Sequence, residues 1–217
     1  MTFANLKSTL EASLRSMEVI PAMVAGSLSR EDLQYVALNQ YGEIRSFIDV
    51  KLPARLYICP HDAMSAKKYF HYLYAEEQGF FGKEPNHAEL FIPVCTDLGI
   101  DRVQLEAYYK KYEQYCFHLF KKEATVANLV EQLAISYAWE TVTPFLGKST
   151  LEAFQRNYDF SETAMRYFEL HFAVDTDHAN EAERVLREYC TTDVLYEIAE
   201  GAIKSTLGSD LYLTKRL

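Results

Sequence analysis

The stretch from Glu162 to Cys190 reads ETAMRYFELHFAVDTDHANEAERVLREYC and contains neither glycine nor proline. Its apolar residues recur at helical spacing, which predicts one long helix. Within it His171, Asp175 and His178 are four and three residues apart, so their side chains share one face of that helix. Three polar groups on one stripe remove much of the apolar face that a helix would otherwise bury. Imidazole and carboxylate side chains together are suitable ligands for iron, manganese or zinc. The stretch therefore predicts both a long helix and a metal site on it.

The rest of the chain contains few helix breakers. Only 8 glycines and 6 prolines occur in 217 residues, and the segments between them are too long for strands and carry helical apolar spacing. We therefore predict an all-α protein, and we expect residues 1–217 to form a single domain whose tail after about residue 207 is weakly patterned. The other predicted helices cover about residues 3–24, 29–49, 61–78, 87–98 and 126–145, with a break around residues 53–60 and a loop over residues 79–85.

Composition excludes several classes of protein. With 49% hydrophobic and 24% charged residues the chain resembles ordinary globular proteins rather than disordered ones. A formal net charge of −9 argues against a nucleic-acid or anionic-membrane partner, because such binding needs clustered lysine and arginine. The four cysteines form no C-x-x-C pair, and no signal peptide or long apolar run is found. We therefore expect a cytoplasmic protein with reduced, core-filling cysteines.

Further metal-type residues lie on apolar faces elsewhere in the chain. Glu140 follows Leu133 and Tyr137 on one stripe of the most apolar predicted helix, where a carboxylate would be costly to bury without a cation. His87 opens a helix whose inward face is apolar. Glu76 and its neighbour Glu77 both follow apolar residues, and periodicity alone does not choose between them.

Taken together, these residues favour a centre with two metal ions. The candidate ligands are three carboxylates and three imidazoles drawn from four predicted helices: Glu76, His87, Glu140, His171, Asp175 and His178. Structural zinc usually takes four ligands and calcium takes oxygen, so this mixture favours a dinuclear iron or manganese centre. A ferritin-like bundle would need Glu-x-x-His on two helices, and the only match here begins at Glu84, beside a proline.

Three motifs give the chain a resemblance to the heme-oxygenase-like diiron oxidases, which are relatives of the thiaminase and pyrroloquinoline-quinone-synthesis folds. The motifs are Glu76-Glu77-Gln78-Gly79 followed by Asn86-His87-Ala88-Glu89-Leu90-Phe91, Glu140 within the apolar helix, and His171-x3-Asp175-x2-His178-Ala179. The similarity in order and spacing covers roughly residues 28–190. In that family the first glutamate of the Glu-Glu-x-Gly pattern is the ligand, so the resemblance favours Glu76.

The resemblance implies a compact, heme-oxygenase-like bundle of about seven helices that forms a homodimer. It implies two Fe(II) ions, with manganese as the alternative, and dioxygen as co-substrate, with an external electron donor as a further partner. The expected reaction is oxidation of a small organic substrate derived from an amino acid or a fatty acid, by oxidative decarboxylation, C–C cleavage or N-oxygenation. The six residues named above would act through the metals.

Three alternatives remain open. One branch of the family makes para-aminobenzoate from its own tyrosine with a lysine ten residues after the ligand glutamate, but Thr150 stands there, with Lys148 nearby. A metal-free, thiaminase-like or cofactor-synthesis enzyme would need another reactive group, such as a nucleophilic Cys95 or Cys116. An acidic interaction protein would leave the inward polar residues as a poorly neutralised network.

Overall fold

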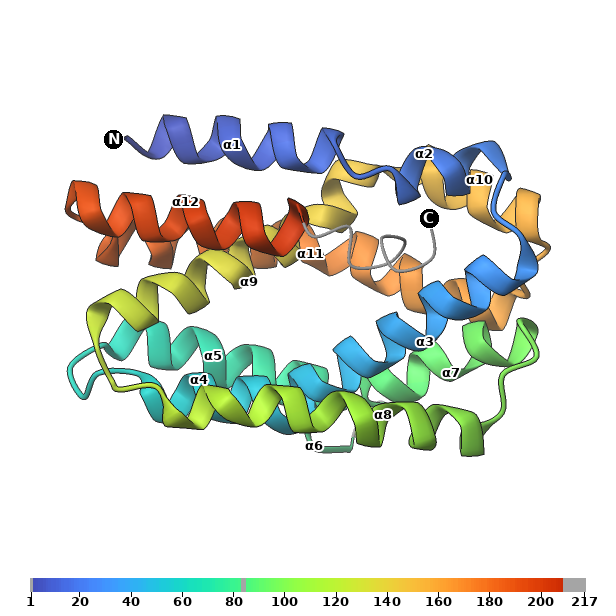
Figure 1. Ribbon diagram of the computed structural model, residues 1–217, viewed down its shortest axis with the longest axis horizontal. Helices are drawn as coiled ribbons and strands as arrows, with labels where there is room; N and C mark the ends of the chain where they lie inside the picture. Colours follow the sequence, from blue (N-terminus) through green and yellow to red (C-terminus); the bar gives the residue numbers. More distant parts are fainter. Residues whose placement is uncertain (1, 83–84, 209–217) are drawn as a thin grey trace.

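The computed structural model describes residues 2–82 and 85–208, apart from the side chains of residues 81, 111, 112, 114 and 115, and this part of the chain is built from helices (Figure 1). They are α1 (Phe3–Arg15), α2 (Val19–Ala25), α3 (Arg30–Ser46), the π-helical turn η1 (Phe47–Lys51), α4 (Leu52–Ile58), α5 (Met64–Glu77), α6 (Gly79–Gly82), α7 (His87–Asp97), α8 (Arg102–Cys116), the 3-10 turn η2 (Phe117–Lys121), α9 (Val126–Leu146), α10 (Lys148–Tyr158), α11 (Glu162–Tyr189) and α12 (Asp193–Gly208). The predicted all-α class is confirmed. The predicted tail after residue 207 lies almost wholly outside the described residues.

Helices α9 and α11 pack along each other, and the other helices surround this pair. Helix α12 packs on α9 with α1 beyond it, α5 and α7 contact α11, and α3 contacts both α7 and α8. In Figure 1 α1 and α12 run across the upper part of the view, and α4, α5 and α8 run below. Two apolar clusters result, one around α1, α9 and α12 and the other between α3, α7, α10 and α11. Across residues 2–82 and 85–208, no helix has the length and apolar character that crossing a bilayer requires.

The bundle contains more helices than expected. If α3, η1 and α4 are counted as one helix, α8 and η2 as another, and the short α6 is left aside, the described residues form 10 helices, whereas about seven were predicted. Part of the difference is the expected helix over residues 3–24, which is wrong because α1 ends at Arg15 and α2 starts at Val19. A continuous helix would need a backbone N–H at Pro21 and space for its ring, whereas the first turn of a new helix tolerates proline.

The expected break over residues 53–60 begins later than predicted, because the chain stays helical from Arg30 to Ile58. The π-helical turn η1 comes directly before Pro53, and the Leu52 N–H donates to the carbonyl five residues back, at Phe47. This wider turn accommodates a proline that a regular α-helix would not. The helix ends only at Cys59, whose extended backbone precedes Pro60.

The continuous helix carries Arg55 into the core. Its guanidinium donates to Ser136 Oγ at 2.7 Å and to Gln132 Oε1 at 3.2 Å, both on α9, and it lies over the Phe47 ring. Burial lowers the Arg55 pKa to about 10. This arginine therefore connects α4 to the helix that carries Glu140.

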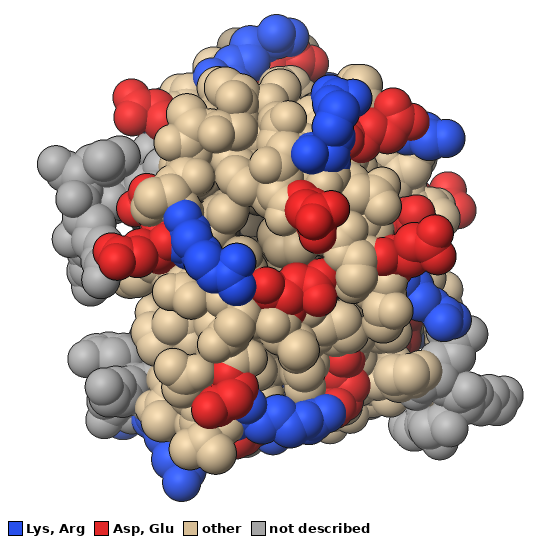
Figure 2. Space-filling model, turned by 90° about the vertical axis from the view of Figure 1, so that its right-hand side faces the viewer, with Lys and Arg blue, Asp and Glu red and all other residues tan. Residues whose placement is uncertain are grey.

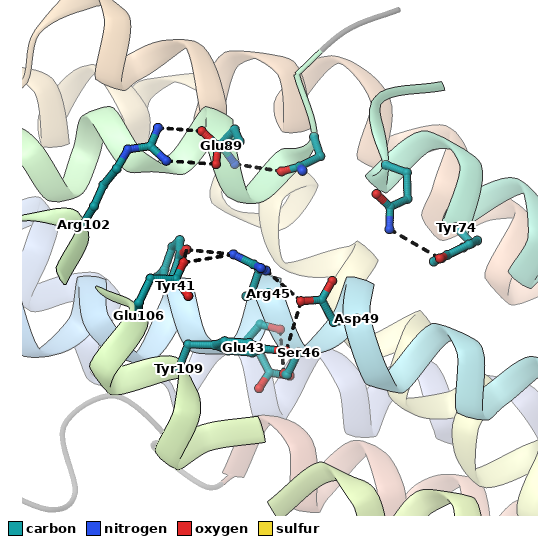
Figure 3. A network of polar contacts seen from close by, with 12 residues as sticks. Tyr41, Glu43, Arg45, Ser46, Asp49, Tyr74, Glu89, Arg102, Glu106 and Tyr109 are labelled. Carbon is teal, nitrogen blue, oxygen red and sulfur yellow. Dashed lines mark hydrogen bonds and ion pairs between the residues drawn. The ribbon is translucent and has the colours of Figure 1, made fainter. Parts of the chain in front are cut away.

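A polar network joins α3 to α8 on the outside of the bundle (Figure 3). Arg45 Nε donates to Asp49 Oδ2 at 2.7 Å, and Arg45 Nη1 donates to Glu106 Oε1 at 3.2 Å. The Tyr109 hydroxyl donates to the same Asp49 oxygen at 3.1 Å. On the face seen in Figure 2, Lys and Arg side chains are scattered among Asp and Glu side chains rather than gathered into one patch.

Three predicted helices agree well with the structure and one expected loop does not. The apolar stretch from Val126 forms α9, the stretch from Glu162 forms α11, and Asn86 caps α7. The Asn86 side chain accepts a hydrogen bond from the Glu89 N–H at 2.9 Å. The expected loop over residues 79–85 contains α6, and residues 83–84 lie outside the described part.

The Asn86 cap generates a stability prediction. Asn86→Ala should lower the free energy of unfolding by about 1 kcal/mol, because the first turn of α7 loses the acceptor for one N–H group. Asn86→Ser keeps a capping oxygen and should stay close to the original stability. Urea unfolding of metal-free protein, followed by circular dichroism, measures both variants. Equal stability of Asn86→Ala and the parent chain would show that this cap is not needed.

Candidate metal centre

Four helices bring metal-type side chains together between α5, α7, α9 and α11. Glu76 and Glu77 are the last two residues of α5, and His87 is the first residue of α7. Glu140 lies in the apolar helix α9, and α11 carries the predicted stripe of His171, Asp175 and His178. All of the predicted ligands except Glu76 fall into two groups of three residues in which the donor atoms lie within 4.8 Å of one another.

The first group consists of Glu77, His87 and His171. His87 Nδ1 lies 2.9 Å from Glu77 Oε2, and the His87 and His171 rings meet edge to face. His171 Nδ1 lies 2.7 Å from the Tyr167 carbonyl oxygen. A carbonyl can only accept, so Nδ1 carries the proton and Nε2 keeps a free lone pair, which is the usual arrangement of a metal-binding histidine.

The second group consists of Glu140, Asp175 and His178. His178 Nδ1 lies 3.3 Å from Glu140 Oε2 and 3.7 Å from Asp175 Oδ1. All three residues are at most 9% exposed. Because Asp175 is four residues after His171 and three before His178, it links the two groups along α11.

The structure places the neighbours Glu76 and Glu77 differently. Glu77 belongs to the first group, whereas Glu76 lies outside both groups with its Oε2 2.7 Å from His178 Nε2. Successive helix residues point about 100° apart, but α5 ends here, so both carboxylates reach the space between the other helices. For this reason sequence periodicity could not choose between Glu76 and Glu77. The Glu-Glu-x-Gly pattern of the family favoured Glu76, which lies outside both groups.

The centre gathers negative charge in the core. Among the described side chains, no lysine or arginine forms an ion pair with Glu76, Glu77, Glu140 or Asp175, whose close partners are histidines. Burial raises the pKa of Glu140 to about 7. Burial alone would lower the pKa of His178, but Asp175, Glu140 and Glu76 outweigh it and raise that pKa to about 12. Without metal, a proton on His178 therefore supplies positive charge that the carboxylates require.

Several buried donor atoms lack a hydrogen bond. Besides the Tyr69 hydroxyl, they are Glu76 Oε2, His87 Nδ1 and Asp175 Oδ1. Glu76 Oε2 lies within 3 Å of His178 Nε2, and His87 Nδ1 lies within 3 Å of Glu77 Oε2, but neither pair has the alignment of a hydrogen bond. Buried polar atoms rarely stay unpaired, so the unpaired His87 Nδ1 and Asp175 Oδ1, which belong to the two groups, are better explained by lone pairs that converge on a cation. The residues present therefore fit two divalent metal ions with mixed nitrogen and oxygen ligands.

Two cavities flank the centre. One of about 230 Å³ is mostly apolar and is lined in part by Glu77, Glu140, His171 and Asp175. The other, of about 240 Å³, lies beside Glu76 and His178, with Tyr69, Tyr72, Asp177 and Glu181 among its lining residues. Asp177 is exposed and belongs to neither group. Sequence reasoning missed the backbone carbonyl of Tyr167, because side-chain patterns do not show which main-chain atom orients a histidine.

Comparisons with known proteins identify the fold and the family. A crystal structure of a domain of unknown function with a heme oxygenase-like fold, from Shewanella denitrificans OS217, is similar with a TM-score of 0.69 and 20% sequence identity. The match covers 98% of this chain and 88% of that chain, and at this identity it shows the fold alone. No match was found among curated proteins. A family model described as iron-containing redox enzyme matches residues 50–207. The chain therefore belongs to this family of iron-containing redox enzymes.

Proposed function

We propose that this protein is a non-heme diiron oxidase that uses dioxygen to oxidise a small organic substrate. The observation that carries the proposal is the pair of three-residue donor groups, joined along α11 and buried beside an apolar cavity. Membership of an iron-containing redox family supports iron over other metals. The mixed ligand set also suits manganese, which is the alternative ion.

In this proposal Glu77, His87 and His171 hold one ion, and Glu140, Asp175 and His178 hold the other. Three carboxylates leave two ferrous ions with a small positive charge, and Glu76 reduces it further through its contact with His178. Glu76 thus orients and polarises a ligand rather than acting as one. Bound iron would supply the electrons that activate dioxygen.

The protein's own residues have separate tasks around that chemistry. The Tyr167 carbonyl fixes the ring orientation and tautomer of His171. The negative charges of the buried carboxylates lie in a medium of low dielectric constant, where their attraction for bound metal ions would be strong. The apolar walls of the 230 Å³ cavity exclude water from the place where an organic substrate would lie.

The alternatives from the sequence receive less support. Burial raises the Cys95 pKa to about 12 and also raises the Cys116 pKa, so neither thiol is activated as a nucleophile. Thr150 donates to the Leu146 carbonyl, and the Lys148 side chain is 77% exposed. Neither residue is placed to act at the centre, as the para-aminobenzoate branch would require.

Metal content after anaerobic loading with ferrous iron tests the proposal. The parent protein should bind about two iron ions per chain. His171→Ala and Asp175→Ala should lose most of this iron while circular dichroism shows an unchanged helical content. Asp177→Asn is the matched control on α11, and it should retain the iron because Asp177 belongs to neither donor group. An Asp175→Ala variant that still binds two irons would refute the proposed centre.

The assignment of Glu77 over Glu76 has its own test. Glu77→Gln should abolish binding at one of the two sites, because an amide is a far weaker ligand than a carboxylate. Glu76→Gln should keep both sites and weaken binding by about 10- to 100-fold, as loss of a residue that supports a ligand does. Iron titration of both variants, with competition by a chelator, measures the number of sites and their affinity. Loss of a site in Glu76→Gln, with both sites kept in Glu77→Gln, would make Glu76 the ligand.

A further inference from the structure

The second cavity, of about 240 Å³, connects the surface of the molecule with the donor groups. Helices α5 and α11, which contact each other, supply its lining. Its outer end is formed by side chains that are exposed or half-exposed: Tyr72, Asp177 and Glu181. Its inner end is formed by residues that are at most 7% exposed: Tyr69, Glu76 and His178. The cavity therefore leads inward between α5 and α11.

The His178 imidazole lies between this cavity and the second donor group. Its Nδ1 lies 3.3 Å from Glu140 Oε2 and 3.7 Å from Asp175 Oδ1, whereas its Nε2 lies 2.7 Å from Glu76 Oε2. Glu76 lines the cavity and belongs to neither donor group. A cation beside Glu76 would therefore be separated from the second group by one side chain.

The charges along the cavity favour a cation. Three of its lining side chains are carboxylates, and no lysine or arginine is among its described lining residues. Asp177 and Glu181 are four residues apart on α11, so they lie on the same side of the cavity. Grouped carboxylates raise the local concentration of cations and speed their entry. Arg184 partly offsets this charge, because it donates to Glu181 at 2.7 and 2.8 Å.

A buried hydroxyl gives separate evidence for a ligand in this cavity. Tyr69 is 3% exposed and lines the cavity, yet its hydroxyl has no aligned hydrogen-bond partner, and neither has Glu76 Oε2. Burial raises the pKa of Tyr69 well above its ordinary value, and the charges of Glu140 and Glu181 add to the rise. The hydroxyl therefore stays protonated between carboxylates at both ends of the cavity. Two unpaired oxygen atoms at the inner end suit a divalent cation that prefers oxygen ligands.

We propose that this cavity is the entry site through which divalent cations reach the donor groups. Asp177 and Glu181 attract the ion from solvent, and Glu76 and Tyr69 hold it at the inner end. A turn of the His178 side chain then opens the way to the second group. This inference rests on the proposed function, because the donor groups are the destination of the ion. It concerns the rate of metal uptake and leaves the amount of metal finally bound unchanged.

The rate of uptake tests the outer carboxylates. Cobalt(II) replaces ferrous iron as the probe and is mixed with metal-free protein by stopped flow. Quenching of Trp139, the only tryptophan of the chain and a neighbour of Glu140, reports its arrival. Glu181→Gln should slow uptake roughly three- to sixfold at low ionic strength, because one charge that attracts the ion is lost. Arg184→Gln should speed uptake by a similar factor, because it removes a competing cation.

Glu188→Gln is the matched control for Glu181→Gln. Both carboxylates pair with Arg184 on α11, and their side chains are 48% and 46% exposed, but Glu188 does not line the cavity. Glu188→Gln should change the rate by less than about twofold. Asp177→Asn should slow uptake as Glu181→Gln does and still reach the same final metal content. Equal rates in Glu181→Gln and Glu188→Gln would overturn the proposal.

Calcium tests the inner end of the cavity. It prefers oxygen ligands, so it should compete for the entry site and slow cobalt uptake without lowering the final cobalt content, for which the donor groups provide nitrogen ligands. Tyr69→Phe removes one oxygen and should raise the calcium concentration needed for half-inhibition by about fivefold. Sodium chloride at the same ionic strength is the control. Equal slowing by sodium and calcium would show screening alone and would refute the entry site.

Final metal content distinguishes failure of this inference from failure of the proposed function. It is measured on each sample after uptake is complete. A parent protein that takes up neither cobalt nor iron would refute the proposed function itself. Two bound metal ions, with uptake rates that do not respond to Glu181→Gln, Arg184→Gln or calcium, would refute only the entry site.

Discussion

Uncompensated negative charge in the core is the constraint on which this structure depends. Four carboxylates meet three histidines between four helices, and none of the described lysines or arginines forms an ion pair with these carboxylates. Burying one unpaired carboxylate costs several kcal/mol, so the bundle tolerates this group only with added positive charge. In metal-free protein the raised pKa of His178 supplies part of that charge. Two divalent cations would supply more of it and would also provide partners for the unpaired donor atoms.

The packing of the bundle holds these side chains in place. Helices α9 and α11 form the central pair, and each contributes metal-type residues to the centre. Arg55 joins α4 to α9 through Ser136, one turn before Glu140, and thus fixes the part of α9 that carries this carboxylate. The Asn86 cap fixes the start of α7, where His87 is the first helical residue. This packing matters because interactions around a metal centre orient its ligands.

Periodic features were predictable from the sequence, and features that depend on local deviations were not. The stripe of His171, Asp175 and His178 could be read because α11 is a regular helix, and Glu140 could be read for the same reason in α9. Periodicity could not choose between Glu76 and Glu77 because α5 ends at that point. Pro53 was expected to break a helix because the sequence does not reveal that a π-helical turn precedes it. The apolar cavity was not predictable either, because its walls come from helices that are distant in sequence.

The two cavities explain why adjacent carboxylates have different surroundings. Glu77 faces the apolar cavity together with His171, whereas Glu76 lines the second cavity beside Tyr72 and Asp177. Since neighbouring helix residues diverge by about 100°, the end of α5 presents one carboxylate to each side of the centre. Tyr72, Asp177 and Glu181 bring polar groups to the side of Glu76, while the apolar walls of the other cavity keep a low dielectric constant around Glu77 and Glu140. The donor groups thereby lie between an apolar cavity and a second cavity that carries more polar side chains.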